Sequence, residues 1–334
     1  MKLSLSLSIC IIILFLLNIL LGSVSIPASD VFNALTGQPV EKESWRYIVV
    51  ESRLPQAVTA LLCGASLAAA GLMLQTSFRN PLAGPSILGI TNGASLGVAL
   101  VLLAGGGVLG ATDSAFHLGG FFAVICGAFI GALLVMGILL GASTVIKSNI
   151  MLLIVGIMVG YLTTSVISLL NFFASADNVH SYVMWGMGSF SDVSLQQLPW
   201  FSGVCVVGLT LSILLVKPLN ALLLGDDYAR NLGINIQQTR SLLLLATGLL
   251  TAIVTAFCGP IAFIGLSVPH IARMFTSSDN HKLLLPATIL MGSVVALVCN
   301  LICITPANTV IPLNAVTPII GAPVILYVII CKRR

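Results

Sequence analysis

Ten apolar runs, most of them about long enough to cross a lipid bilayer, follow one another along this chain of 334 residues. A hydrocarbon core roughly 30 Å thick needs about 20 apolar residues per helical span. Only 7% of the residues are charged, whereas a soluble domain carries roughly 25%. We therefore predict an all-α polytopic membrane protein with about ten transmembrane helices in a single domain over residues 1–334. The runs lie at about residues 3–24, 57–78, 86–106, 117–140, 150–172, 198–217, 241–258, 261–275, 283–304 and 315–331.

The basic residues indicate the orientation of these spans. With the N-terminus in the cytoplasm, the loops on that side and their flanks contain Lys2, Arg79, Lys147, Lys217, Arg230, Arg240, Arg273, Lys282, Lys332, Arg333 and Arg334, and the outer segments contain Lys42, Arg46 and Arg53. Cytoplasmic loops carry an excess of Lys and Arg. We therefore expect both termini in the cytoplasm, with the first run retained as a helix.

The acidic residues bear on the energy source of a transporter. None of the ten Asp and Glu residues lies in the middle of a predicted span. Carriers driven by protons or sodium usually place a carboxylate there, so the pattern speaks against ion coupling. Backbone carbonyls can also bind sodium, and an ion-gradient-driven secondary transporter with inverted repeats stays as the alternative.

Two segments combine Gly and Pro in similar ways and predict breaks in helices. The first contains Asn80-Pro81 and Gly84-Pro85, and the second contains Gly259-Pro260. Proline removes a backbone donor and glycine allows tight turns. Breaks at matching places in two halves are typical of inverted repeats in transporters, here spans 2–5 and 7–10. The alternative is that Gly and Pro simply end spans.

Glycines four residues apart predict close contacts between helices. The pairs are Gly93/Gly97, Gly127/Gly131, Gly137/Gly141 and Gly156/Gly160. Gly93-Ala94-Ser95-Leu96-Gly97 also matches the hydrolase pattern G-x-S-x-G, which has meaning only at a strand-to-helix turn. Inside an apolar span it indicates packing.

Signatures of catalysis are missing from the sequence. It has no Walker A motif, no H-E-x-x-H and no C-x-x-C, and its four histidines are scattered. We expect no enzyme activity, no cofactor, no metal site and no nucleic-acid partner. If transport uses ATP, another chain must hydrolyse it.

Residues 218–237 form the longest cytoplasmic connection and mix leucines with charges. Asp226 or Asp227 can cap a short helix after a turn at Gly225, and Gly233 can end it. Two short helices with exposed apolar faces are expected. Such a pair could lie on lipid or dock on a cytoplasmic partner, and the residues alone leave both open.

Many motifs in order along nearly the whole chain resemble the FecCD-type permeases, the membrane subunits of ABC importers for iron-siderophores, haem and cobalamin. The motifs are Arg53-Leu54-Pro55, Gly64-Ala65, Gln75, Arg79-Asn80-Pro81-Leu82-Ala83, Pro85, Leu88-Gly89, Gly93-Ala94, Trp185 with Gly188-Ser189, Leu224-Gly225-Asp226, Ala229, Leu232-Gly233, Gly259-Pro260-Ile261, Phe263, Gly265-Leu266, Pro269-His270, Arg273 and Gly321-Ala322-Pro323.

The resemblance implies a homodimer in the bacterial cytoplasmic (inner) membrane. It also implies two cytoplasmic ABC ATPase subunits and an extracytoplasmic substrate-binding protein that delivers the cargo. Residues 219–234 would be coupling helices on the ATPase, which selects the docking interpretation. The coupling residues would be Leu222, Leu223, Leu224, Gly225, Asp226, Asp227, Ala229, Arg230, Leu232 and Gly233.

Further roles are implied by the same resemblance. Residues of about 150–190 would gate the pathway, with Trp185, Gly188 and Ser189 in the gate region. The helix-break and pathway motifs are Asn80, Pro81, Gly84, Pro85, Gly259, Pro260, Pro269, His270 and Arg273.

The sequence departs from the family pattern in the regions linked to docking of the binding protein. Members often read R-L-P-R and carry Asp and Arg in the ninth span, whereas this chain has Gln56 after Pro55 and reads Asn300-Leu301-Ile302-Cys303. Arg53 is then the remaining docking arginine. The cargo is expected to be a bulky metal chelate, an iron-siderophore or haem ahead of cobalamin.

Overall fold

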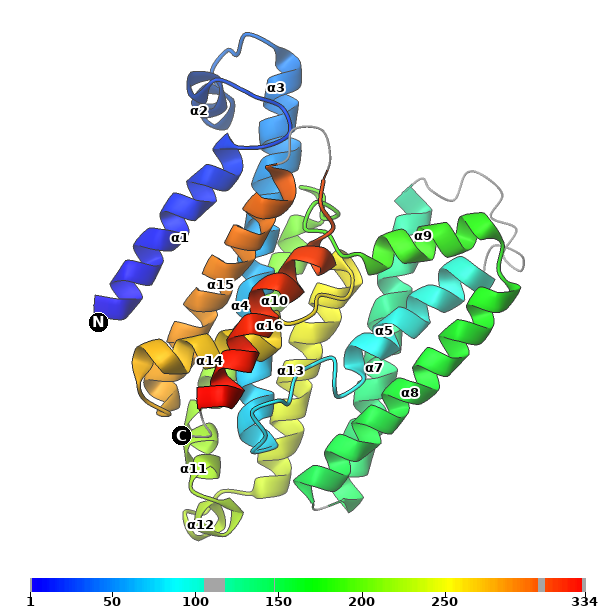
Figure 1. Cartoon of the computed structure of the whole chain (residues 1–334), viewed down its shortest axis with the longest axis vertical. Helices are drawn as coiled ribbons and strands as arrows, with labels where there is room; N and C mark the ends of the chain where they lie inside the picture. Colours follow the sequence, from blue (N-terminus) through cyan, green and yellow to red (C-terminus); the bar gives the residue numbers. More distant parts are fainter. Residues whose placement is uncertain (1, 105–117, 147, 306–309, 332–334) are drawn as a thin grey trace. The chain divides into compact units, whose positions relative to one another are not determined.

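The computed structural model describes residues 2–104, 118–146, 148–305 and 310–331, and these residues form helices joined by turns (Figure 1). Basic residues at 147 and 332–334 lie outside the described ranges, and the cytoplasmic placement of the termini stays a prediction. The helices are α1 (Lys2–Leu20), α2 (Ala28–Thr36), α3 (Glu43–Tyr47), the π-helical η1 (Ile48–Arg53), α4 (Leu54–Ser77), α5 (Ile90–Ala99), the π-helical η2 (Leu100–Ala104), α7 (Leu118–Val145), α8 (Asn149–Phe173), α9 (Ala176–Gly186), α10 (Leu198–Leu214), α11 (Val216–Leu223), α12 (Asp226–Asn231), α13 (Ile236–Cys258), α14 (Ile264–Thr276), α15 (His281–Ile304) and α16 (Leu313–Cys331).

Each predicted span contains a helix, which confirms an all-α, multi-pass membrane protein. Within the described residues, six helical stretches are long and apolar enough to cross a membrane on their own: Leu3–Leu20, Glu43–Ser77, Phe122–Val145, Asn149–Phe173, Ile236–Cys258 and His281–Ile304. Helices α10 and α11 pass the same test together but are bent by 48°. The predicted span 86–106 begins late, at Ile90, because the chain turns through residues 78–89.

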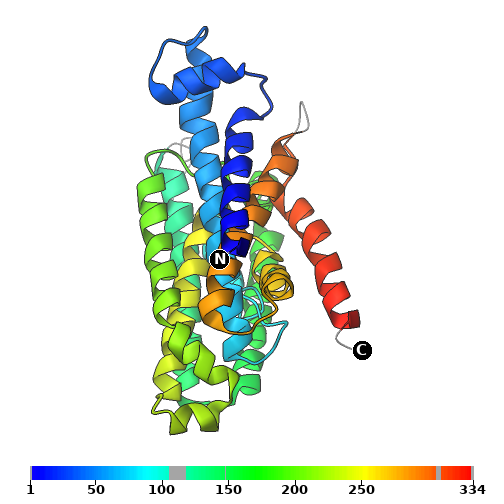
Figure 2. The ribbon, with the colours of Figure 1, turned by 90° about the vertical axis from the view of Figure 1, so that its left-hand side faces the viewer.

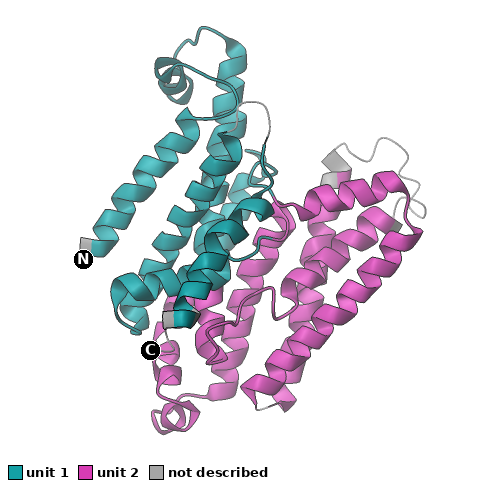
Figure 3. Cartoon of the chain, in the orientation of Figure 1, with its two compact units in different colours: residues 1–69, 189–207, 261–334 teal, residues 70–188, 208–260 magenta. Residues whose placement is uncertain are grey.

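The chain divides into two compact units (Figure 3). Unit 1 comprises residues 1–69, 189–207 and 261–334, and unit 2 comprises residues 70–188 and 208–260. In unit 1, α1 lies alongside α15 in both views (Figures 1 and 2), and α14 packs on α15 and α16. The amphipathic α2 buries Val31 and Ala34 in a cluster with Ile19 and Val49.

Glycine contacts hold the centre of unit 2 together. A Cβ atom added at Gly97 would overlap the carbonyl oxygen of Gly127, and one at Gly93 would lie 2.6 Å from the carbonyl oxygen of Gly131. The backbones of α5 and α7 therefore touch, as the spacing predicts and as small residues allow in membranes. Gly137, in contrast, is exposed on α7, and a Cβ there would meet nothing within 4 Å, so the expected close contact does not form at Gly137/Gly141 within this chain.

These contacts lead to a test of packing. Gly97→Ala should lower the thermal stability of the purified protein in detergent, because the added methyl group meets backbone that cannot move aside; overpacking of this kind costs about 1–3 kcal/mol. Gly137→Ala adds the same group on α7, where there is open space, and should leave the melting temperature unchanged. Equal melting temperatures for the two variants would contradict the close contact.

Candidate functional site

Residues 218–237 form the pair of short helices that the sequence predicts. Helix α11 ends at Leu223, the chain turns at Leu224 and Gly225, and α12 runs from Asp226 to Asn231. Gly225 has φ 115° and ψ 154°, a conformation that essentially only glycine adopts. The predicted cap is wrong: the N-cap of α12 is Gly225, which has no side chain to bond the first turn. Asp226 and Asp227 are instead the first two helical residues.

The exposed apolar surface of this segment is smaller than predicted. Leu222 and Ala229 are buried, with exposed fractions of 5% and 0%, and they hold the two helices in place rather than presenting a surface. We call the remaining exposed side chains, Leu223, Leu224, Tyr228 and Leu232, the apolar knob; their exposed fractions run from 43% to 63%. Asp227 and Arg230 lie beside the knob and are also exposed.

Asp226 joins three parts of unit 2. Its Oδ1 lies 2.6 Å from a guanidinium nitrogen of Arg79, and its Oδ2 lies 3.8 Å from one of Arg240. Arg79 follows the end of α4, whereas Arg240 projects from α13 and is 8% exposed. Sequence reasoning assigned neither arginine to the coupling residues. The only available signal was that each is a basic residue at the cytoplasmic end of a predicted span.

The structure confirms the first predicted helix break. After α4 ends, turns occupy residues 78–89 until α5 begins at Ile90. The side chain of Asn80 accepts a hydrogen bond from the Leu82 amide at 2.9 Å, and its carbonyl accepts one from the Ala83 amide at 3.0 Å. Pro81 and Pro85 fix two further φ angles, and Gly89 (φ 76°) turns the chain into α5.

A second break separates α13 from α14, again as predicted. Helix α13 ends at Cys258, Gly259 and Pro260 follow, and Phe263 adopts φ 66° directly before α14. Gly89 and Phe263 thus occupy the same place, a left-handed residue that precedes an Ile at the start of a helix. This likeness supports the inverted repeat of spans 2–5 and 7–10, which stays a prediction.

The structure brings two of the predicted motifs together in unit 2. A Cβ atom at Gly259 would lie 2.5 Å from the carbonyl oxygen of Trp185 and 3.2 Å from the Cα of Gly188. The break after α13 therefore packs directly against the end of α9, where the gate region was predicted. Ser189 follows; its hydroxyl lies 2.6 Å from that of Ser191 and accepts a hydrogen bond from the Ser191 amide.

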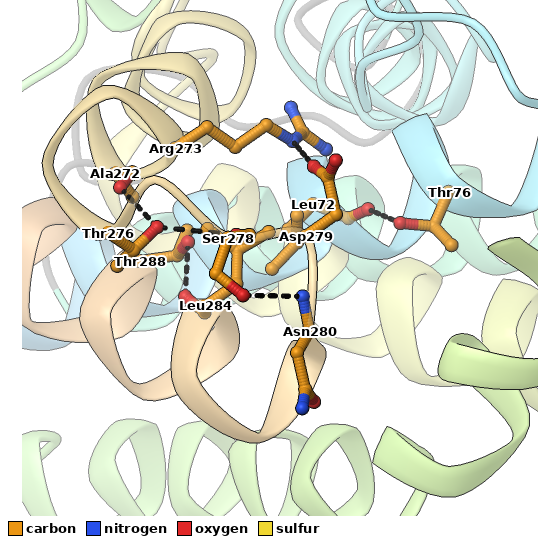
Figure 4. Close-up of polar contacts among 10 residues, drawn as sticks. All are labelled: Leu72, Thr76, Ala272, Arg273, Thr276, Ser278, Asp279, Asn280, Leu284 and Thr288. Atoms are coloured by element: carbon orange, nitrogen blue, oxygen red, sulfur yellow. Dashed lines mark hydrogen bonds and ion pairs between the residues drawn. The ribbon is translucent and has the colours of Figure 1, made fainter.

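The remaining pathway motif, Pro269, His270 and Arg273, lies on α14 in unit 1. Pro269 and His270 are buried. Arg273 forms an ion pair with Asp279 across the turn that ends α14, with a nitrogen–oxygen distance of 3.5 Å (Figure 4). The same turn is held by Thr276, whose hydroxyl donates to the carbonyls of Ala272 and Ser278. The arginine thus stabilises the helix end.

Arg53 does not present the surface that docking of a binding protein would need. It is 5% exposed, and its guanidinium donates hydrogen bonds to the carbonyls of Ile19 at 2.9 Å, Leu20 at 2.8 Å and also Val24. The last carbonyls of a helix lack partners within the helix. Arg53 therefore caps α1, which corrects the expectation from the sequence.

The two departures from the family pattern lie next to each other in unit 1. The amide of Gln56 on α4 donates to Asn300 on α15 at 3.1 Å, and Asn300 donates to Asn18 on α1 at 2.7 Å. Asn18 also donates to the carbonyls of Leu297 and Leu14. Hydrogen bonds between neutral side-chain amides therefore link α1, α4 and α15. They lie at the position where charged side chains would need partners of opposite charge.

Metal-ligating side chains do not gather in the parts of the chain that the structure describes. No group of three or more His, Cys, Asp or Glu residues lies close enough there to hold an ion. Cys299 and Cys303, one turn apart on α15, are both buried. The described residues offer hydrogen-bonding and apolar surfaces rather than a coordination site.

Comparison with known proteins agrees with this architecture. The FecCD transport family model matches residues 10–331. The vitamin B12 import system permease BtuC of Klebsiella pneumoniae is 36% identical over 282 residues, which cover 84% of this chain and 82% of the relative. The BtuC of Salmonella typhi is 32% identical over 331 residues, which cover 99% and 95%.

Two solved structures share the fold. One, described as an inward-facing conformation of a candidate metal-chelate type ABC transporter, has a TM-score of 0.85 and 27% identity and covers 99% of both chains. The other, PsaBC from Streptococcus pneumoniae in complex with Fab, has a TM-score of 0.54 at 16% identity, covers 82% of this chain and 90% of its own, and shows the fold alone. The multi-span helical fold and the family match over residues 10–331 lead to one conclusion: the chain belongs to the FecCD transport family.

Proposed function

We propose that this permease works as a homodimer in an ABC importer and moves a bulky metal chelate into the cytoplasm. Two ABC ATPase subunits would supply the energy, and a substrate-binding protein would deliver the cargo from outside. The observation that carries the proposal is the apolar knob. Four large exposed side chains lie on α11 and α12 and at the residues that directly follow each helix, as a docking element for a cytoplasmic partner requires.

Cobalamin is the first cargo to test, because the relatives named above are vitamin B12 permeases. Iron-siderophores and haem are the other members of the same chemical class, all large chelates with the metal already coordinated. The described residues contain no group of side chains that could hold a metal ion. This fits a cargo that is recognised as a whole chelate.

Helix α8 supports a pathway along the fifth span. It exposes Tyr161, Thr164, Ser165 and Ser168, all on successive turns of an otherwise apolar helix. The three Ser and Thr hydroxyls donate to carbonyls of their own helix, so each stays satisfied when dry and can accept a further hydrogen bond when wet. We infer that these hydroxyls line an aqueous pathway between two copies of the chain, whereas the exposed Leu162 and Leu169 beside them suit apolar contact.

Transport by the reconstituted complex tests the proposed function. The chain and its ATPase are reconstituted in liposomes, and the binding protein is added on the opposite side of the membrane from the ATPase. Cobalamin, an iron-siderophore or haem should be taken up only when ATP is present on the side where the ATPase lies. ATP hydrolysis should rise when the loaded binding protein is added. Uptake driven by a proton or sodium gradient without ATP would instead establish the secondary transporter.

The apolar knob can be tested separately. The double variant Leu224→Ser/Leu232→Ser should lower the affinity for the ATPase at least tenfold, because a loss of about 1.4 kcal/mol is tenfold and truncation of one well-packed interface side chain can cost that much. Leu283→Ser removes an equally exposed leucine at the start of α15 and should leave the affinity unchanged. Full affinity in the double variant would show that the ATPase binds elsewhere.

A further inference from the structure

The Asp226 junction connects the apolar knob to the first helix break. Asp226 is the first residue of α12, and Arg79 is the second residue after the end of α4. Both carboxylate oxygens are engaged, Oδ1 by Arg79 and Oδ2 by Arg240. An exposed ion pair alone contributes little, but one carboxylate between two arginines, one of them buried, holds them together against their mutual repulsion.

The break itself is a stiff segment. From Arg79 to Gly89 the backbone is held by hydrogen bonds from Asn80 to Gln75, from Ala83 to Asn80, from Leu88 to Gly84 and from Gly89 to Ser86, with distances between 3.0 and 3.4 Å. Pro81 and Pro85 remove two further rotations. These bonds form two turns, residues 75–83 and 84–89, that follow each other directly, with Pro85 next to the junction.

The far end of the segment is closely packed against α8. A Cβ atom at Gly89 would lie 2.9 Å from the carbonyl oxygen of Gly156, and one at Gly156 would lie 3.0 Å from the Cα of Leu88. Gly160 similarly faces the side-chain amide of Asn92. Close-packed contacts transmit displacement because they cannot be compressed. All these residues belong to unit 2.

We propose that Asp226 and Arg79 are the positioning residues that transmit movement of α11 and α12 to α8, through residues 79–89 and the Gly89–Gly156 contact. The inference rests on the proposed function, since it presumes that an ATPase moves the apolar knob. It adds the route by which that movement reaches the pathway. The carboxylate of Asp226 faces Arg79 and Arg240, whereas the carboxylate of its neighbour Asp227 is exposed to solvent.

The first test measures the cargo taken up per ATP hydrolysed by the reconstituted complex. Asp226→Asn and Arg79→Gln should each lower this ratio about tenfold, the size of a typical coupling free energy between sites; because the ratio is counted per ATP hydrolysed, a slower hydrolysis alone does not lower it. The double variant should be no worse than Asp226→Asn alone, because that substitution already removes the ion pair with Arg79. Asp279→Asn breaks the comparable Arg273 pair in unit 1 and should keep the wild-type ratio.

The second test observes α8 directly. A spin label at Ile150→Cys, an exposed position on α8, with the native cysteines changed to alanine, should change mobility on addition of ATP in the otherwise wild-type complex. The change should vanish in Asp226→Asn and in Gly156→Ala, which leaves the ion pairs intact.

The outcomes separate the two proposals. If the wild-type chain neither binds an ATPase nor responds to ATP, the proposed function is overturned. An importer that works, but in which Asp226→Asn and Arg79→Gln keep both the ratio and the response of the label, would overturn the transmission route alone. Additive losses in the double variant would likewise show that the two residues act separately.

Discussion

Backbone groups inside a membrane must find hydrogen-bond partners within the protein, and the rest of this structure depends on that constraint. It produces the long helices, and it makes each interruption of a helix costly unless other groups satisfy the freed amides and carbonyls. In the first break, Asn80 supplies two of the acceptors. In the second, the side chain of Asn314 accepts the amide of Ala262 at 3.2 Å. Where α1 ends, Arg53 takes the same role for carbonyls. Two polar residues of the motifs, Asn80 and Arg53, are thus committed to the backbone.

Because such residues stabilise the backbone, the role of a charged residue is hard to infer from its motif alone. Arg53 and Arg273 both belong to family motifs, yet the first caps a helix and the second closes a turn with Asp279. Gln56 and Asn300 replace groups that are often charged in the family, and they bond to each other and to Asn18. A pair of neutral amides in place of two opposite charges avoids the cost of burying charges.

Prediction from the sequence succeeded wherever a local signal sufficed. The spans follow from apolar length, the breaks from Gly-Pro pairs, and the short helices at 218–237 from a turn at Gly225 flanked by leucines. It failed where the answer depended on a residue distant along the chain. The cap assigned to Asp226 or Asp227 was wrong because the helix begins one residue earlier, with Gly225 at the N-cap, and the carboxylate of Asp226 pairs with Arg79, 147 positions away. Leu222 and Ala229 were expected among the coupling residues of the exposed apolar faces, and both are buried.

The sequence by itself therefore determined the membrane environment, the helical class, the approximate bounds of the long helices, the places where they break, and the family. These properties depend on the apolar run length and on the backbone limits of single residues. Only the tertiary structure decided which side chains are free to act. It joined Trp185 and Gly188 to Gly259, placed Gly89 on Gly156, buried Arg53 and set Asp226 between two arginines. Each of these contacts depends on the close approach of helices that are remote in sequence, and no periodicity or motif encodes that distance.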